Sequence, residues 1–228
     1  MGVYEKFFQY HRIDQSILLA KFAHFFCMSI KRKVKAVERV FKSLDEEINR
    51  LKAKTGLHCL TGCGMCCTKP DIEASPLEFL PLAFEWFQNG QAMEKLEFLQ
   101  QNYSPICVSY APLSLIDQTS GSCGTYLNRG LICRLFGYGA TRDKNGELKL
   151  VTCKLIKEDQ PGGYATAHQL IHQKEYIPVF SDYYKKLFQI DFKLANQVYP
   201  INKAIQVALE EILHYYAYRP FSPIKKTG

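Results

Sequence analysis

The first quarter of the chain carries an amphipathic pattern. Apolar residues recur at intervals of three or four, and charged residues fill most positions between them. This spacing predicts a helix with one buried face. The helical region is expected over residues 1–55, and Gly56 is its natural end. The apolar positions that define the buried face are Val34, Val37, Phe41, Leu44, Ile48 and Leu51.

Two helices are predicted between residues 76 and 102. Ser75-Pro76-Leu77-Glu78 has the form of a capping box, in which Ser75 starts a helix and Glu78 reaches back to it. This signal predicts a helix over 76–88, which ends near an Asn-Gly pair. A second, short helix is expected over 91–102.

The pattern then changes to that of a β-hairpin. Apolar residues in 135–141 and in 148–151 flank the turn signal Asn145-Gly146. Such a turn between two apolar runs predicts two antiparallel strands. The hairpin would place Cys133 at its entry and Cys153 at its exit, and therefore close together in space.

The last third of the chain is predicted to be helical again. Pro161-Gly162-Gly163 is expected to act as a break before a helix over 164–172. Apolar residues at helical spacing predict further helices within 177–196 and 201–217. The polar tail 222–228 is expected to fray.

Together these elements predict a mainly α-helical fold with a small β-hairpin. Residues 1–228 are expected to form a single domain. Its parts are an N-terminal helical region (1–55), an irregular cysteine-rich core (56–155) and a C-terminal helical region (156–228). The helices on both sides are expected to pack around the cysteine-rich core.

Composition and charge exclude some classes of protein. Of 228 residues, 47% are hydrophobic and 22% are charged, which supplies enough apolar material for a core and excludes wholesale disorder. The formal net charge is +7. The most apolar stretch, 17–30, is too short for a spanning helix of about 20 residues and contains Lys21. No transmembrane segment is therefore predicted.

A basic run follows this apolar stretch, at Lys31, Arg32, Lys33 and Lys35. It suits contact with a membrane surface or with nucleic acid. No nucleic-acid recognition motif accompanies it, so nucleic acid is not a predicted partner. A solvated helix face is the simplest interpretation of the run.

The cysteine content changes the picture most. The chain has nine cysteines, and four of them fall between residues 59 and 67. Its opening residues, MGVYEKFFQY, lack the apolar core of a secretion signal, so a cytoplasmic location is expected. In a reducing compartment, clustered cysteines are more often metal ligands or catalytic groups than disulfides. Cys27, on an apolar helical stretch, is expected to be a core residue instead.

The segment 59–67 reads C-x3-C-x2-C-C. Thiolates at this spacing converge on one centre where a loop turns, and Gly62 and Gly64 permit such turns. Adjacent side chains usually diverge, so Cys66 and Cys67 are expected to serve different centres or different roles. The predicted metal ligands are Cys59, Cys63, Cys66, Cys67, Cys107, Cys123, Cys133 and Cys153.

Eight thiolates suit either zinc or iron. They could hold two four-coordinate ions, or an iron-sulfur cluster with a second site. Structural zinc sites usually pair two short units, whereas only Cys63 and Cys66 form C-x2-C here. The C-x3-C-x2-C spacing resembles the radical-SAM arrangement for a four-iron cluster, although Met65 stands where those proteins usually have an aromatic residue. The spacing thus favours iron slightly.

The order of cysteines resembles one known family. After C-x3-C-x2-C-C come a lone cysteine, the string C-x-x-Y-x-x-R-x-x-x-C-R from Cys123 to Arg134, and one more cysteine. This order is similar to that of the YkgJ-type cysteine-cluster family, described as zinc- or iron-chelating proteins, over about 56–155. The resemblance implies metal binding most directly for Cys59, Cys63, Cys66, Cys67, Cys123 and Cys133, and less directly for Cys107 and Cys153, where the spacing is looser. The family commonly has proline where this chain has Gly130.

The resemblance and the residues leave two functions open. The first is a metal-binding protein whose iron-sulfur cluster or zinc is structural or redox-active and which acts through a protein partner. The second is an iron-sulfur-dependent enzyme. The family includes the flagellin lysine N-methylase FliB, which implies that some members transfer methyl groups. The residues of this chain show no Gly-rich methyltransferase loop.

Five other residues are candidates for supporting roles. Arg129 and Arg134 are expected either to offset the charge of the thiolates, with Asp117 as another partner for Arg129, or to be surface arginines. His58, next to Cys59, is a candidate extra ligand. His168 and His172 have a spacing that suits a metal, but they lack the glutamate of a zinc-protease motif.

Overall fold

The structure is a computed structural model that describes residues 28–113, 120–173, 175 and 177–221. Several expectations lie outside these residues. They concern the helical character of 1–27, the core position of Cys27, the pairing of Arg129 with Asp117 and the frayed tail 222–228. Within the described parts of the chain, the fold is mainly helical and has three small two-stranded antiparallel sheets.

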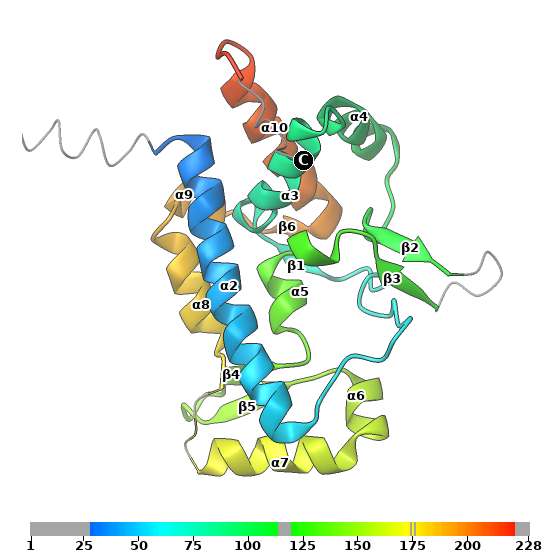
Figure 1. The fold of residues 1–228 in the computed structure, drawn as a ribbon, viewed down its shortest axis with the longest axis vertical. Helices are drawn as coiled ribbons and strands as arrows, with labels where there is room; N and C mark the ends of the chain where they lie inside the picture. The colour runs from blue at the N-terminus through cyan, green and yellow to red at the C-terminus, as the bar shows by residue number, and fades with distance from the viewer. Residues whose placement is uncertain (1–27, 114–119, 174, 176, 222–228) are drawn as a thin grey trace, which may run out of the picture.

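The first described helix, α2 (Ile30–Thr55), runs along most of the molecule (Figure 1). All six apolar positions that the pattern predicted are buried, so this part of the prediction is confirmed. The helix ends at Gly56, whose φ of 74° is left-handed and whose N–H donates to the carbonyl of Lys52 at 2.8 Å. Glycine suits this cap because it adopts positive φ without strain.

The capping box predicted at Ser75 is also confirmed. Ser75 N–H and hydroxyl donate to Glu78 Oε1 at 2.9 and 3.1 Å. The first turn is a 3₁₀ helix, η1 (Pro76–Phe79), and α3 (Leu80–Gln88) continues from it. The predicted short helix follows as α4 (Ala92–Gln101).

Glu78 does more than cap its own helix. Its side chain is fully buried, and its second oxygen, Oε2, accepts the backbone N–H of Ile132 at 2.8 Å. Ile132 belongs to α5 (Leu131–Leu135), which carries Cys133. One buried carboxyl group therefore ties the start of η1 to the helix that holds a predicted ligand.

The predicted hairpin is present, but its first strand is shorter than expected. Strands β4 (Gly139–Arg142) and β5 (Leu148–Val151) pair antiparallel around the Asn-Gly turn, with Gly146 at φ 83°. Leu135 ends α5 instead of starting a strand, because the Phe136 N–H still donates to the carbonyl of Ile132. Within the apolar run 135–141, the first residue therefore belongs to helix α5, and only the residues from Gly139 onward form the strand.

The glycine pair near residue 162 does not break a helix. After α6 (Lys154–Asp159), α7 (Pro161–His172) begins at the proline and includes both glycines, so the break between the two helices lies before Pro161 and the start expected at residue 164 was too late. Proline is favourable at the first helical position. A Cβ on Gly163 would lie 2.6 Å from the carbonyl oxygen of Thr55, so this glycine lets α7 approach the end of α2.

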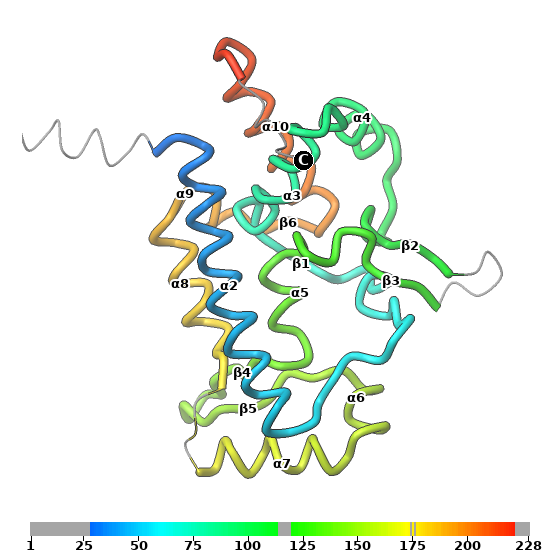
Figure 2. The backbone as a smooth tube through the Cα atoms, in the orientation of Figure 1, coloured from blue at the N-terminus to red at the C-terminus, as the bar shows by residue number. Residues whose placement is uncertain are grey.

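The remaining helices cover α2 and the upper part of the molecule. The stretch predicted over 177–196 forms two helices, α8 (Phe180–Phe188) and α9 (Phe192–Ala195). The final predicted helix is confirmed as α10 (Ile201–Tyr216). Helices α3, α7 and α8 pack against α2, whereas α10 packs against α3 and α4, as the tube in Figure 2 shows.

Two small strand pairs were not predicted. β1 (Glu73–Ala74) pairs with β6 (Tyr199–Pro200), and β2 (Tyr110–Pro112) pairs with β3 (Gly121–Cys123). The first pair joins the segment after the cysteine cluster to the C-terminal helix. The buried apolar residues of all three chain regions form one connected cluster. Among the described helices, none has the length and apolar character needed to cross a membrane.

The contact of α7 with α2 gives a testable prediction. Gly163→Ala should lower the free energy of unfolding by about 1–3 kcal/mol, because the new methyl group would meet a backbone carbonyl. Gly162→Ala is the matched control in the same helix, where nothing lies within 4 Å of the added Cβ. It should be neutral or slightly stabilising. Urea denaturation measures both; equal losses in the two variants would contradict this packing.

Candidate metal centre

All eight cysteines that the motif predicted as ligands line a single cavity of about 320 Å³. They come from the loop after α2, the segment before β2, strand β3, helix α5 and the start of α6. Long stretches of sequence separate these segments, so the shared cavity is a product of the tertiary fold. The cysteines are Cys59, Cys63, Cys66, Cys67, Cys107, Cys123, Cys133 and Cys153.

The glycines of the cysteine loop act in two different ways. Gly62 has a φ of 72°, the left-handed conformation that the loop was expected to need. Its carbonyl accepts the N–H of Gly121 at 2.9 Å, and the next residue, Cys63, forms a β-bridge with Ser120. Gly64 has no positive φ, but a Cβ there would lie 2.2 Å from the Tyr110 ring. The loop therefore closes directly onto the β2–β3 pair.

Backbone hydrogen bonds place the deeper cysteines. The N–H of Cys107 donates to the carbonyl of Cys67 at 2.9 Å, which joins the cysteine loop to the chain before β2. Cys123 ends β3 and pairs with Tyr110. Cys153 caps α6, where its sulfur accepts the N–H of Ile156 at 3.3 Å. Backbone contacts thus hold three of the sulfur-bearing segments at the cavity wall.

The Cys67 thiol lies in hydrogen-bond contact with two other thiols, those of Cys66 and Cys123. The contact lowers the pKa of Cys66 and of Cys123, because a donated hydrogen bond favours their thiolates, and it raises the pKa of Cys67. Burial raises the pKa of Cys107 to about 11 and also raises the pKa of Cys133. The deeper thiols therefore keep their protons at neutral pH unless a cation replaces them.

This contact corrects the expectation that the two adjacent side chains diverge, whereas the expectation that they serve different centres or different roles stays a prediction. Cys66 and Cys67 do not diverge: both line the cavity, and their thiols are hydrogen-bonded to each other. The reason is the turn over 64–67, in which the N–H of Cys67 donates to the carbonyl of Gly64 at 2.9 Å.

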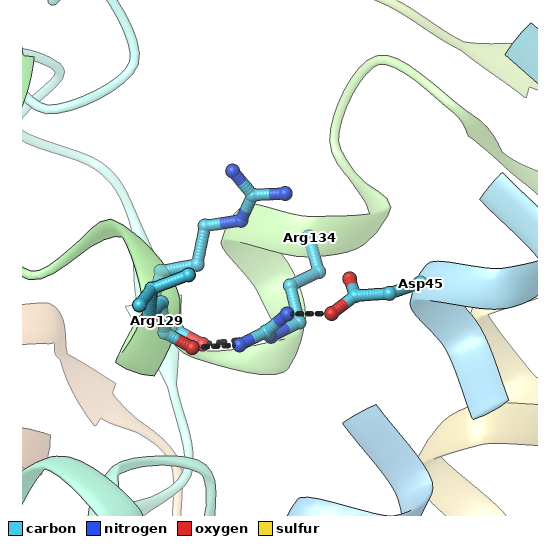
Figure 3. Close-up of polar contacts among 4 residues, drawn as sticks. Asp45, Arg129 and Arg134 are labelled. Carbon is cyan, nitrogen blue, oxygen red and sulfur yellow. Dashed lines mark hydrogen bonds and ion pairs between the residues drawn. The ribbon is translucent and has the colours of Figure 1, made fainter. Parts of the chain in front are cut away.

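The two arginines near Cys133 have different roles. Arg134 is buried, and Figure 3 shows its guanidinium group between Asp45 of α2 and the carbonyl groups of the preceding turn. It pairs with Asp45 at 2.5 Å and donates to the carbonyls of Leu127 and Arg129. Arg134 therefore fixes α5 to α2. Arg129, in contrast, lines the cavity.

Arg129 also stacks on a neighbour that the sequence reasoning did not single out. Its guanidinium carbon lies 3.8 Å from the centre of the Tyr126 ring, and Tyr126 lines the cavity too. The spacing of three residues in Tyr-x-x-Arg is a signal that could have indicated this pair. Other missed wall residues are Lys69, Phe79, Phe136 and Tyr138.

The histidine candidates do not join the cysteines. His58, His168 and His172 are not among the residues that line the cavity. His58 is exposed, and its Nδ1 lies 3.0 Å from the carbonyl oxygen of Gly56. His168 packs edge to face against Tyr164, with ring centres 4.6 Å apart. The described cavity wall contains no histidine, aspartate or glutamate, so its donors are sulfur.

Gly130 has a structural explanation. Its φ of −62° is one that proline also adopts, so the backbone turn itself does not require glycine. A Cβ at this position would lie 2.7 Å from Phe79 Cζ and 3.2 Å from Glu78 Oε2. The large aromatic side chain at Phe79, a wall residue of the cavity, occupies the space that a ring at Gly130 would need.

The eight sulfurs are distributed over the wall of the cavity. Among the described residues, no group of three or more His, Cys, Asp or Glu side chains has the arrangement of a site for one ion. A cavity of about 320 Å³ is far larger than the roughly 10–15 Å³ that one water-sized particle requires. As a donor set, eight thiols around such a volume suit a thiophilic group of several atoms.

Comparisons with protein-family models, with curated proteins and with solved structures find no match for this chain. The resemblance to the cysteine-cluster family therefore rests on the motif residues alone and stays a prediction.

The Arg134 contacts give a prediction about stability. Arg134→Leu should lower the free energy of unfolding by about 2–4 kcal/mol, because two partly buried carbonyl groups lose their donor and Asp45 loses its cation. Asp45→Asn should cost about 1 kcal/mol or less, since the Asp45 side chain is 41% exposed. Chemical denaturation of both variants measures the difference. A larger loss in Asp45→Asn would show that the ion pair, and not the carbonyl contacts, dominates.

Proposed function

We propose that this protein is an iron-sulfur protein whose cluster is held by thiolates of the cysteine-lined cavity. One observation carries the proposal: eight sulfurs from five segments line one cavity, and among the described residues no three of them are arranged as a site for one ion. A single zinc ion needs four donors directed at one position. A cluster with several irons is different, because each iron takes its own ligand and the sulfurs must be spread around it.

The number of donors bears on the number of clusters. Four thiolates hold one four-iron cluster, so eight suffice for two such clusters or for one cluster with free thiols beside it. The contacts among Cys66, Cys67 and Cys123 make this group the best candidate for the first cluster. Cys107 is a further candidate donor for this cluster, because its backbone N–H donates a hydrogen bond to the carbonyl of Cys67.

A redox role fits the position of the cavity better than a purely structural one. Cys59 and Cys66 are exposed, whereas Cys107 is 7% exposed, so the cavity reaches from the surface into the core. A centre close to the surface can exchange electrons with a protein partner. When bound, the cluster would supply one-electron chemistry, while the surrounding residues set its potential and limit its contact with water.

A reducing, cytoplasmic location is part of the proposal. The eight cysteines of the cavity are all free thiols in the structure. Thiols at this density are kept free where glutathione and thioredoxin maintain reducing conditions. A lysine-methylating activity, which the family resemblance implies for some members, stays a prediction.

Anaerobic purification followed by iron, zinc and sulfide analysis tests the proposal. The expected result is iron with an equal amount of acid-labile sulfide, at about four irons per chain for one cluster or about eight for two. A broad visible absorption that bleaches on reduction should accompany it. Stoichiometric zinc without sulfide would instead identify a zinc protein and overturn the proposal.

A cysteine variant tests the site itself. Cys67→Ser should lower the iron and sulfide content at least about tenfold, because Cys67 contacts two other thiols of the cavity. Ser122→Ala is the control, since Ser122 lines the same cavity but carries no sulfur. It should retain the full content. Circular dichroism checks that both variants are folded; a folded Cys67→Ser with full iron and sulfide would remove Cys67 from the ligand set.

A further inference from the structure

Arg129 is the arginine of the cavity wall, and one of its donors is unused. Its Nε is buried and has no hydrogen-bond partner among the described residues. The Tyr126 ring, 3.8 Å from the guanidinium carbon, holds the side chain on one face. In Figure 3 the guanidinium group of Arg129 points away from the Arg134–Asp45 pair. A buried N–H without an acceptor is unfavourable, so it indicates a missing acceptor.

The charge of Arg129 is also uncompensated within the described parts of the chain. The ion pairs found there include Arg134 with Asp45, but none involves Arg129. The described cavity wall contains no carboxylate that could neutralise it. Its electrostatic neighbours include the thiols of Cys59, Cys66 and Cys123, besides Arg134 and Tyr138. An anionic sulfur would therefore both accept the hydrogen bond of the Arg129 Nε–H and neutralise the charge of its guanidinium group.

Lys69 is the other cation of the wall, and it differs from Arg129 in two respects. Its side chain belongs to an exposed residue, and its ammonium group is not among the buried atoms that lack a partner. An ammonium in water is strongly hydrated and largely screened. Arg129, held by an aromatic ring with a buried donor, is the cation whose charge acts on the cavity.

We propose that Arg129 is a positioning residue that sets the reduction potential of the bound cluster. Its Nε–H donates a hydrogen bond to a sulfur of the cluster or of a thiolate ligand, and its positive charge compensates the negative sulfurs. Reduction adds one negative charge, so a fixed positive charge and a hydrogen bond to sulfur stabilise the reduced form. This inference rests on the proposed iron-sulfur function.

Three variants test the role of Arg129, with the midpoint potential of the purified holoprotein as the readout. Arg129→Gln should lower the potential by about 59 mV or more, a tenfold change in the ratio of reduced to oxidised one-electron centre. Arg129→Lys should give a smaller decrease, because lysine keeps the charge but loses the planar stack and the Nε–H. Arg219→Gln is the control. Arg219 stacks on Tyr215 at 4.3 Å, is exposed, and does not line the cavity, so its loss should leave the potential unchanged.

The outcomes separate this inference from the proposed function. If the unmodified protein contains iron and sulfide but Arg129→Gln keeps the same potential, Arg129 does not tune the cluster and only this inference fails. If the unmodified protein contains zinc without sulfide, the proposed function fails first. If Arg129→Gln does not load the cluster, the midpoint potential of Tyr126→Ala tests the inference instead. Tyr126→Ala retains the arginine but removes its support, and the inference requires a lowered potential in this variant.

Discussion

The rest of this structure depends on how eight thiol groups are accommodated around one cavity. If they were all ionised, their negative charges would repel one another in a partly closed space. If they stayed protonated, the cavity would bring together eight weak donors that contribute little to stability. A thiophilic cation removes the conflict, because it displaces the protons and binds the sulfurs. Burial raises the pKa of Cys107 and of Cys133, so these deeper thiols keep their protons at neutral pH unless a cation displaces them.

The scaffold can be understood as the means of holding these segments together. Helix α2 provides a long apolar face, and its last turn leads directly into the cysteine loop. Glu78 ties η1 to α5, and Arg134 ties α5 to α2, so two buried polar groups fix the position of Cys133. The close approach of α7 at Gly163 secures the same end of α2. These contacts hold the elements that carry the cavity wall in place.

Several elements were predictable because local signals and tertiary burial agree. The amphipathic stretch before Gly56 and the capping box at Ser75 are of this kind. The start of α7 was predicted too late, because Gly163 lies inside the helix and serves its close packing on Thr55, which is far away in the chain. Strands β2 and β3 have no alternating pattern, so their pairing was not predictable. The set of cysteines at the cavity was expected from their spacing, whereas Arg129 on Tyr126 required the folded structure.

The central claim is that sulfur atoms of the chain bind the metal directly. X-ray absorption at the iron edge of the anaerobically purified holoprotein measures this most directly, because it identifies the atoms of the first coordination shell. The account predicts a shell of sulfur together with an iron-iron distance, as a cluster held by thiolates requires. A first shell dominated by nitrogen or oxygen, or the absence of an iron-iron distance, would contradict it.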